Sequence, residues 1–212
     1  MDELRNYREW HKEYDDPDSG ISWRLRAVQR YISDALDTTT GPVRVLSCCS
    51  GDGRDIIGVL GRREDADRVH VTLVEIDPVL ADRARSSAGA AQLPHLEVRV
   101  TDAGNTDAYL GVVPVDLVLL VGIFGNIDDE DLERTIQTSP ELCAPGATLV
   151  WSRGRDHTDR NDAVRRWFAE AGFTEIDYLE RNSGSRPALG AVRYEGEPRE
   201  LRPGRRLFTF WR

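Results

Sequence analysis

The stretch VLSCCSGDGRDIIGVL, residues 45–60, decides the fold. Its first part continues an apolar run typical of a buried strand, and its last part has the apolar spacing of a helix. Gly51 and Gly53 lie between the two parts and permit a tight turn that a ligand can approach closely. A strand, a glycine turn and a helix in this order predict one unit of an α/β sheet.

The same alternation of strand and helix continues along the chain. Including that first unit, the predicted strands are 43–49, 69–76, 96–100, 115–121 and 147–151, and the predicted helices are 54–62, 78–91, 129–138 and 161–171. Continuous apolar strands are buried on both faces, so we expect a mostly parallel sheet covered by helices on both sides. We expect Asn161 to cap the last of these helices, and Ser22 to cap an earlier amphipathic helix that lies against the sheet.

The C-terminal part of the pattern differs, because no helix separates its strands. Segments 173–180, 190–196 and 206–212 are predicted strands, and at least one pair among them should be antiparallel.

Composition limits the class of protein. The chain has 212 residues, 28 Lys and Arg against 37 Asp and Glu, and a net charge of −9. We expect one domain over 1–212, with a helical lid or extension at 1–40 and an α/β core at 41–212. The absence of a long apolar run or a secretory signal predicts a cytoplasmic protein without a membrane partner. The excess of acidic residues disfavours binding to nucleic acid, although residues 181–212 are locally basic.

The ends of the second and third predicted strands carry carboxylates. Glu75 lies 22 positions after Gly53 and can accept hydrogen bonds from both hydroxyls of a ribose. Asp77 precedes Pro78 and is expected to cap the next helix instead. Asp102 can accept a hydrogen bond from an adenine amino group, and the backbone amide of Ala103 can donate one to a ring nitrogen.

Two other nucleotide sites are disfavoured. A dinucleotide fingerprint requires a small residue where Ile56 stands, and its pyrophosphate would lie close to Asp52 and Asp55. A phosphate-binding P-loop requires a Lys after the glycines, and none is present. A glycine turn rich in acids fits a ligand with a ribose and cationic groups but no phosphate. The adjacent pair Cys48 and Cys49 lacks the spacing of a disulfide framework or a zinc site, so we expect no metal.

Together these features resemble the class I S-adenosylmethionine-dependent methyltransferases. The resemblance covers about residues 43–180 and rests on VLSCCSGDG, Glu75, Asp102 with Ala103, VDLVLLVGIFGNI and LCAPGATLVW. It implies a Rossmann-like three-layer sandwich with a seven-stranded sheet, in which RLFTFW is the antiparallel last strand. The S-adenosylmethionine site that it implies comprises Ser47, Cys48, Cys49, Gly51, Asp52, Gly53, Asp55, Glu75, Ile76, Asp102, Ala103 and Gly122.

The chain departs from the family pattern in its first motif. Ser47 stands where the family usually has an acid, and Cys49 stands where it has its first glycine. A cysteine at a position that requires positive φ would be strained. Asp52 or Asp55 can compensate for the missing acid by binding the amino group of the cofactor.

Candidates on the acceptor side come from three loops. Asn126 follows the fourth predicted strand and can hydrogen-bond an acceptor, or it can cap the helix around 128–132. His157 follows the fifth strand, where an imidazole can act as a base. Tyr14 belongs with Trp10 and His11 to an aromatic N-terminal segment that either closes over the cofactor or packs on the core.

We therefore expect a methyltransferase that acts on a small molecule, as a monomer or a homodimer. One alternative is a cofactor-binding protein of the same fold that does not methylate, either a cyclase-like enzyme or a sensor. A nucleotide-sugar or dinucleotide enzyme is a weaker alternative.

Overall fold

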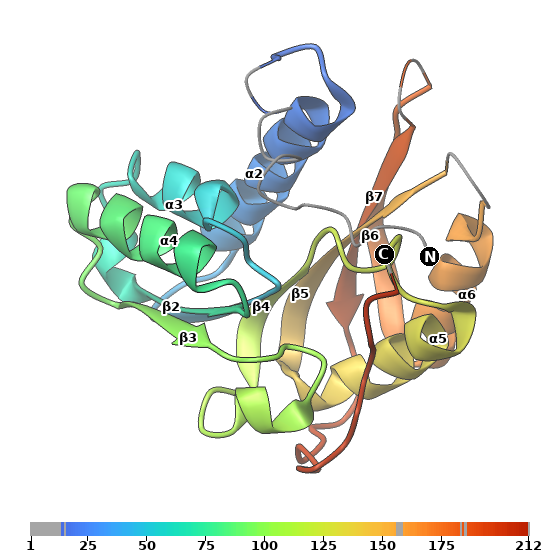
Figure 1. Cartoon of the computed structure of the whole chain (residues 1–212). Coiled ribbons are helices and arrows are strands. Elements are labelled where there is room, and N and C mark those ends of the chain that lie inside the picture. The colour runs from blue at the N-terminus through green and yellow to red at the C-terminus, as the bar shows by residue number, and fades with distance from the viewer. Residues whose placement is uncertain (1–13, 15, 156–158, 183, 185, 212) are drawn as a thin grey trace.

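The computed structural model describes residues 14, 16–155, 159–182, 184 and 186–211. Within these residues seven strands form one sheet in the order β3-β2-β1-β4-β5-β7-β6 (Figure 1). The strands are β1 Val43–Cys48, β2 Val69–Glu75, β3 Leu96–Val100, β4 Val115–Leu120, β5 Cys143–Gly154, β6 Phe173–Glu180 and β7 Pro187–Tyr194. β1 to β5 pair in parallel, and β7 runs antiparallel to both β5 and β6. The predicted seven-stranded, mostly parallel sheet is confirmed.

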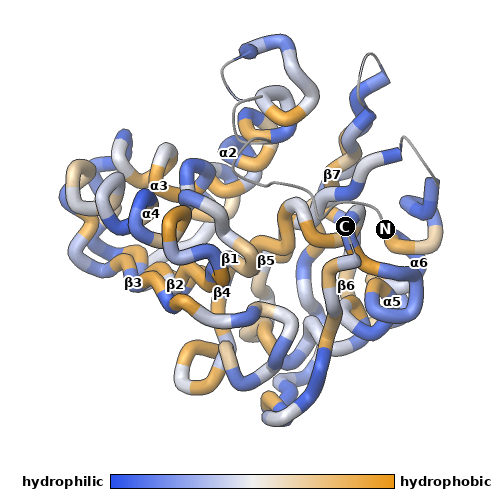
Figure 2. Tube along the Cα trace, viewed as in Figure 1, coloured by the Kyte–Doolittle hydropathy of each residue, from blue (hydrophilic) through white to orange (hydrophobic). Residues whose placement is uncertain are grey.

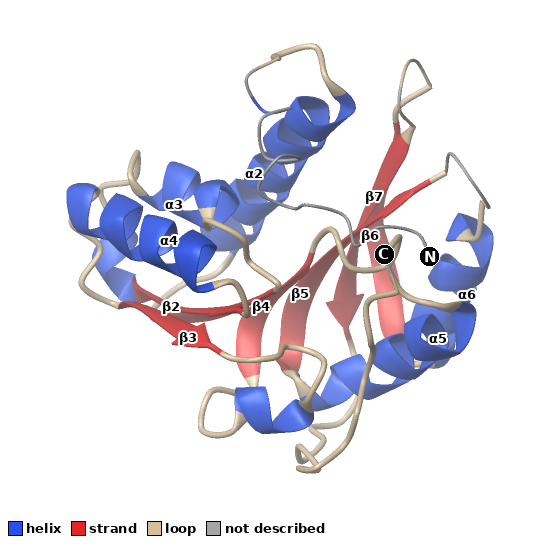
Figure 3. Cartoon of the chain, in the orientation of Figure 1, coloured by secondary structure: helices blue, strands red, loops and turns tan. Residues whose placement is uncertain are grey.

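Helices cover both faces of this sheet (Figure 3). The α-helices are α2 Gly20–Thr38, α3 Arg54–Leu60, α4 Pro78–Ala90, α5 Asp129–Thr138 and α6 Asn161–Glu170. Short 3₁₀ helices lie in the connections, namely η2 Ala66–Arg68, η3 Thr106–Tyr109 and η4 Ser139–Glu141. In the described part of the chain, every helix is too short or too polar to cross a lipid bilayer.

The core consists of two apolar clusters, one on each side of the sheet. One side joins α2, α3 and α4 to the strands through residues such as Ile32 and Ile56, and the other joins α5 and α6 through Leu132 and Phe168. Figure 2 shows the apolar residues concentrated along the strands between these layers. Strands with apolar side chains on both faces require this double cover.

The order of the strands reverses at β1. The chain runs from β1 outward to β2 and β3, and then returns to place β4 on the other side of β1. In open α/β sheets, ligands bind beyond the carboxyl ends of the strands at such a reversal. The loop after β1 therefore lies at the position where a site is expected.

The predicted last strand at 206–212 is wrong, because the seventh strand is β7. Leu207 donates its N–H to Gly104 O (2.8 Å), and Arg205 O accepts from Thr106 N (3.0 Å). The segment is thus held by the loop after β3, with a single isolated bridge between Asn105 and Arg206.

Two of the three predicted helix caps are also wrong. Ser19 caps α2, since its hydroxyl accepts from Ser22 N (3.1 Å) and the helix begins earlier than predicted. Asn161 is the first residue of α6, and its buried side-chain amide has no hydrogen-bond partner among the described residues. Asp77 does cap α4, by accepting from Val79 N (2.8 Å).

Trp151 of β5 makes Gly190 of β7 sterically necessary. The indole is fully buried, and a Cβ placed on Gly190 would lie 2.4 Å from the indole Nε1. We expect Gly190→Ala to lower the free energy of unfolding by about 1–3 kcal/mol through overpacking. Gly89 of α4 has open space around it, so Gly89→Ala should raise stability by up to about 1 kcal/mol. Urea denaturation checks both variants, and equal effects at the two sites would contradict this account.

Candidate functional site

The loop after β1 contains three residues with positive φ, in the left-handed region of backbone conformation. Cys49 has φ 51°, Gly51 has φ 58° and Gly53 has φ 67°. A Cβ on Gly53 would lie 2.7 Å from the Leu73 side chain, so the close approach of this turn to β2 requires glycine. Cys49 adopts the positive φ that the sequence indicated, at a position where a side chain is strained.

Glu75 at the end of β2 holds this turn in place. One carboxylate oxygen accepts from Gly51 N (2.7 Å) and the other from Asp77 N (2.8 Å). The side chain is 6% exposed, and burial raises the pKa of the carboxyl above its usual range, against the two backbone hydrogen bonds, which lower it. Each oxygen keeps a further lone pair for another donor.

Asp102 and Ala103 follow β3 on the same edge of the sheet. One oxygen of Asp102 accepts from Gly104 N (2.8 Å), and the other forms an ion pair with Arg206. Ala103 is buried, and its carbonyl oxygen accepts from the Tyr109 hydroxyl.

Three side chains close the opposite end of the site, near the glycine turn. The Arg54 guanidinium lies over the Tyr14 ring, 4.0 Å from its centroid, and the Tyr14 hydroxyl accepts from Arg24 (3.2 Å). Arg54 also pairs with Asp52, with Nε to Oδ1 at 2.9 Å. Tyr14, α2 and the start of α3 therefore form one connected wall.

Asp55 also lies in this wall, and its hydrogen-bond partner differs from the Arg54 partner of Asp52. Its carboxylate accepts from Ile56 N (2.7 Å), and burial raises the pKa of the carboxyl. The nearby Arg24 lowers that pKa by a smaller amount. A half-buried carboxylate of this kind favours a cationic ligand group beside it.

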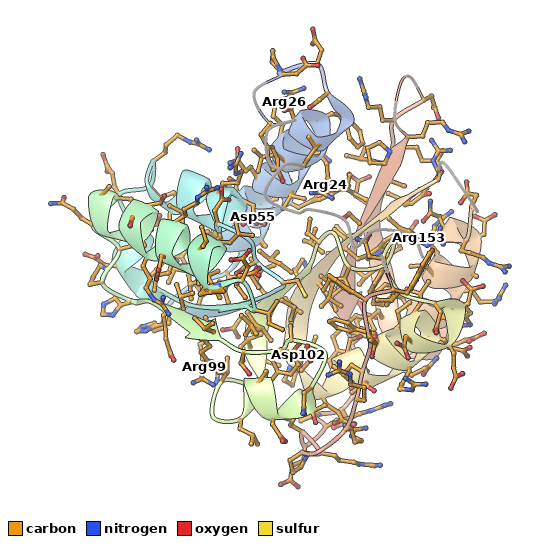
Figure 4. The ribbon with its side chains drawn as sticks, viewed as in Figure 1. Arg24, Arg26, Asp55, Arg99, Asp102 and Arg153 are labelled. Atoms are coloured by element: carbon orange, nitrogen blue, oxygen red, sulfur yellow. The ribbon has the colours of Figure 1, made fainter. Side chains whose placement is uncertain are left out.

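These residues surround one cavity of about 570 Å³ at the carboxyl edge of the sheet. In the view of Figure 4, Arg24 and Asp55 lie above it and Asp102 lies below it. The predicted site residues that line the cavity are Tyr14, Ser47, Cys49, Gly51, Asp52, Asp55, Glu75, Ile76, Asp102, Ala103 and Gly122. Residues from five separate parts of the sequence thus meet at the place where the strand order reverses.

Three of the predicted site residues that the structure describes, Cys48, Gly53 and Asn126, do not line this cavity. Cys48 is buried in the core, where burial raises the pKa of its thiol to about 12. Gly53 lies on the side of the turn that packs against the Leu73 and Ile57 side chains. Asn126 donates to Gly122 O (2.7 Å) and does not cap α5, because Asp128 is the cap. His157, like Trp10 and His11, lies outside the described residues.

Several lining residues were not among the predicted site residues, namely Arg24, Leu25, Val28, Ser50, Arg54, Leu80, Val121, Arg206, Phe208, Thr209 and Phe210. The amphipathic pattern of the first helix included Leu25 and Val28, which signalled that this helix contacts the sheet. Among the described residues, no group of three or more His, Cys, Asp and Glu side chains is arranged to hold a metal ion.

The adjacent cysteines offer a test of the turn. Cys49→Val places a β-branched residue at positive φ and should lower the free energy of unfolding by about 1–3 kcal/mol. Cys49→Gly relieves that strain, so it should lower the free energy of unfolding by less than about 1 kcal/mol. Cys48→Val, in the strand itself, is the matched control, and nearly conserved volume should limit its effect to about 1.5 kcal/mol. If chemical denaturation showed Cys49→Val to be as stable as Cys48→Val, the strain at Cys49 would be disproved.

Comparison with known proteins identifies the fold. No protein-family model and no curated protein sequence matches the chain. Magnesium protoporphyrin IX methyltransferase from Synechocystis PCC 6803, solved with bound S-adenosylmethionine, superposes with a TM-score of 0.71 at 13% identity, over 89% of this chain and 91% of the other. The CurJ carbon methyltransferase gives 0.65 at 14% identity, over 84% and 56%. An O-methyltransferase family protein from Burkholderia thailandensis gives 0.59 at 19%, over 82% and 58%. The chain has the Rossmann-like fold of the class I S-adenosylmethionine-dependent methyltransferases.

Proposed function

We propose that the protein binds S-adenosylmethionine in this cavity and transfers its methyl group to a small-molecule acceptor. The observation that carries the proposal is the Glu75 carboxylate, which is fixed by Gly51 and Asp77 and lines the cavity with lone pairs to spare. The cavity volume of about 570 Å³ lies within the range of small-molecule sites, about 300–1,000 Å³. A single domain and a cytoplasmic location remain part of the proposal.

The residues present fit each part of the cofactor. Glu75 would accept both ribose hydroxyls, and the exposed side chain of Ile76 would cover one face of the adenine. Asp102 and the Ala103 amide would bind the adenine edge. Asp55 is the better candidate for the amino group, because Asp52 is already paired with Arg54.

The bound cofactor supplies an electrophilic methyl group on a sulfonium. The protein has to align an acceptor with it and exclude water, and alignment and desolvation can supply most of the rate enhancement. Tyr14 lines the cavity beside Arg24 and Arg54, and this position supports a role in covering the methyl-bearing end. His157 stays a candidate base, and Asn126 braces the loop on which an acceptor would rest.

The ribose contact is tested by Glu75→Ala. Loss of two charge-assisted hydrogen bonds should weaken the binding of S-adenosylhomocysteine by about 2 kcal/mol or more, measured by isothermal titration calorimetry. Glu97→Ala is the matched control, because Glu97 is exposed at β3, pairs with Arg99 and is not among the described residues that line the cavity. Equal affinities of the two variants would contradict the proposed site. Binding without methyl transfer to any acceptor screened would favour the non-methylating alternative.

The binding should also depend on pH. Burial raises the pKa of Glu75, so the protonated, neutral form persists to a higher pH than the usual glutamate value of about 4.3. Only the ionised form accepts both hydroxyls, so affinity should fall as the pH is lowered through this raised pKa. The stability of the ligand-free protein depends on pH in the opposite direction. The folded state binds the Glu75 proton more tightly than the unfolded state, so protonated Glu75 stabilises the fold at low pH, and this stabilisation is lost as the pH rises.

Titration calorimetry between pH 4 and pH 8 measures the effect. Asp55→Asn removes the other cavity carboxyl whose pKa is raised and should leave the loss of affinity on acidification in place. A pH-independent affinity for this variant would assign the effect to Asp55 and refute the role given to Glu75.

A further inference from the structure

The C-terminal segment, residues 201–211, crosses the carboxyl edge of the sheet, and we call it the strap. Its Leu207 N–H donates to Gly104 O, and Trp211 N–H donates to Asn126 O (3.1 Å). Between these points Thr209 N–H donates to the Asp131 carboxylate (2.7 Å). In Figure 1 the strap is the dark red segment that runs past α5 toward the loop after β4. The strap therefore links the loops that follow β3 and β4 to α5.

One side of the strap forms a wall of the cavity. Phe208 and Phe210 stack with their ring centroids 5.6 Å apart, and both line the cavity. Phe208 is buried, and a Cβ on Gly104 would lie 2.3 Å from Phe208 O. Glycine at 104 is therefore what lets the strap lie so close to the loop that carries Asp102.

Arg206 connects the strap to Asp102 directly. Its guanidinium pairs with one Asp102 oxygen, and its Nε donates to the Thr209 hydroxyl (3.1 Å). Gly104 N–H holds the other oxygen. The carboxylate is thus fixed from two sides, and each oxygen keeps a lone pair for a further donor. Both side chains are about half exposed, at 47% for Arg206 and 42% for Asp102, so a ligand can reach the pair.

We propose that the strap determines which base the site accepts, with Arg206 as a positioning residue that orients Asp102. This inference rests on the proposed function. A carboxylate held in this orientation accepts a hydrogen bond from an exocyclic amino group, as adenine has. A base with a carbonyl oxygen at the same position places that oxygen against the carboxylate and is disfavoured. The two phenylalanines supply apolar contact that does not distinguish the two bases.

The test compares S-adenosylhomocysteine with S-inosylhomocysteine, which differ in that exocyclic group. Binding of both is measured by titration calorimetry for wild type, Arg206→Ala and Arg202→Ala. Arg202 is an exposed arginine of the same strap that lines no part of this cavity, so it controls for the lost charge. Arg206→Ala should weaken the adenine ligand about tenfold and change the hypoxanthine ligand little, so the preference for adenine falls about tenfold. Arg202→Ala should keep the wild-type preference.

A second variant separates base selection from folding. Phe210→Ala should weaken both ligands to a similar degree and leave their ratio unchanged. If Arg206→Ala lowers the melting temperature but keeps the wild-type ratio, Arg206 is only structural and the inference is wrong. Tighter binding by Arg206→Ala would also overturn it, because Arg206 would then compete with the ligand for Asp102. A wild-type protein that binds neither ligand would refute the proposed function itself.

Discussion

The position of the Glu75 carboxylate is the constraint on which the rest of the site depends. β1 and β2 are neighbouring parallel strands, and the two hydrogen bonds of Glu75 join the loop after one to the start of the helix after the other. Burial of a carboxylate opposes folding, and the raised pKa is the sign of that opposition. The glycine turn, the start of α4 and the floor of the cavity are arranged around this one group.

Much of the sheet could be predicted because its signals are local. Apolar runs separated by helical patterns indicate buried parallel strands, and chain order then places Glu75 and Asp102 at adjacent strand ends. The positive φ of Cys49 could likewise be expected, because the methyltransferase family pattern has a glycine at this position. The placement of Glu75, Asp102 and the turn at one cavity follows from topology alone, since parallel strands bring their carboxyl ends to the same edge.

The remaining features depend on contacts between distant residues. The apolar and aromatic composition of RLFTFW is typical of a strand, but its backbone groups bond to the loop at 104–106, which no local pattern reveals. Arg206 meets Asp102 only because of that crossing. Asn161 has the residue type of a cap and yet is the first residue of α6, and no described residue bonds to its side-chain amide. Propensity suggests what a residue can do at a helix end, whereas packing decides where the helix begins.

The insertion of β7 between β5 and β6 has a consequence for the order of assembly. Among the described strands β6 pairs only with β7, so β6 has no place in the sheet until residues 187–194 are available. Side chains of α2, including Ile32, pack in the same cluster as Leu189 and Ala191 of β7. An early helix and a late strand therefore complete the fold together. Such non-local pairing slows folding, and a ribosome-bound chain would expose the open edge of β5 until β7 has been synthesised.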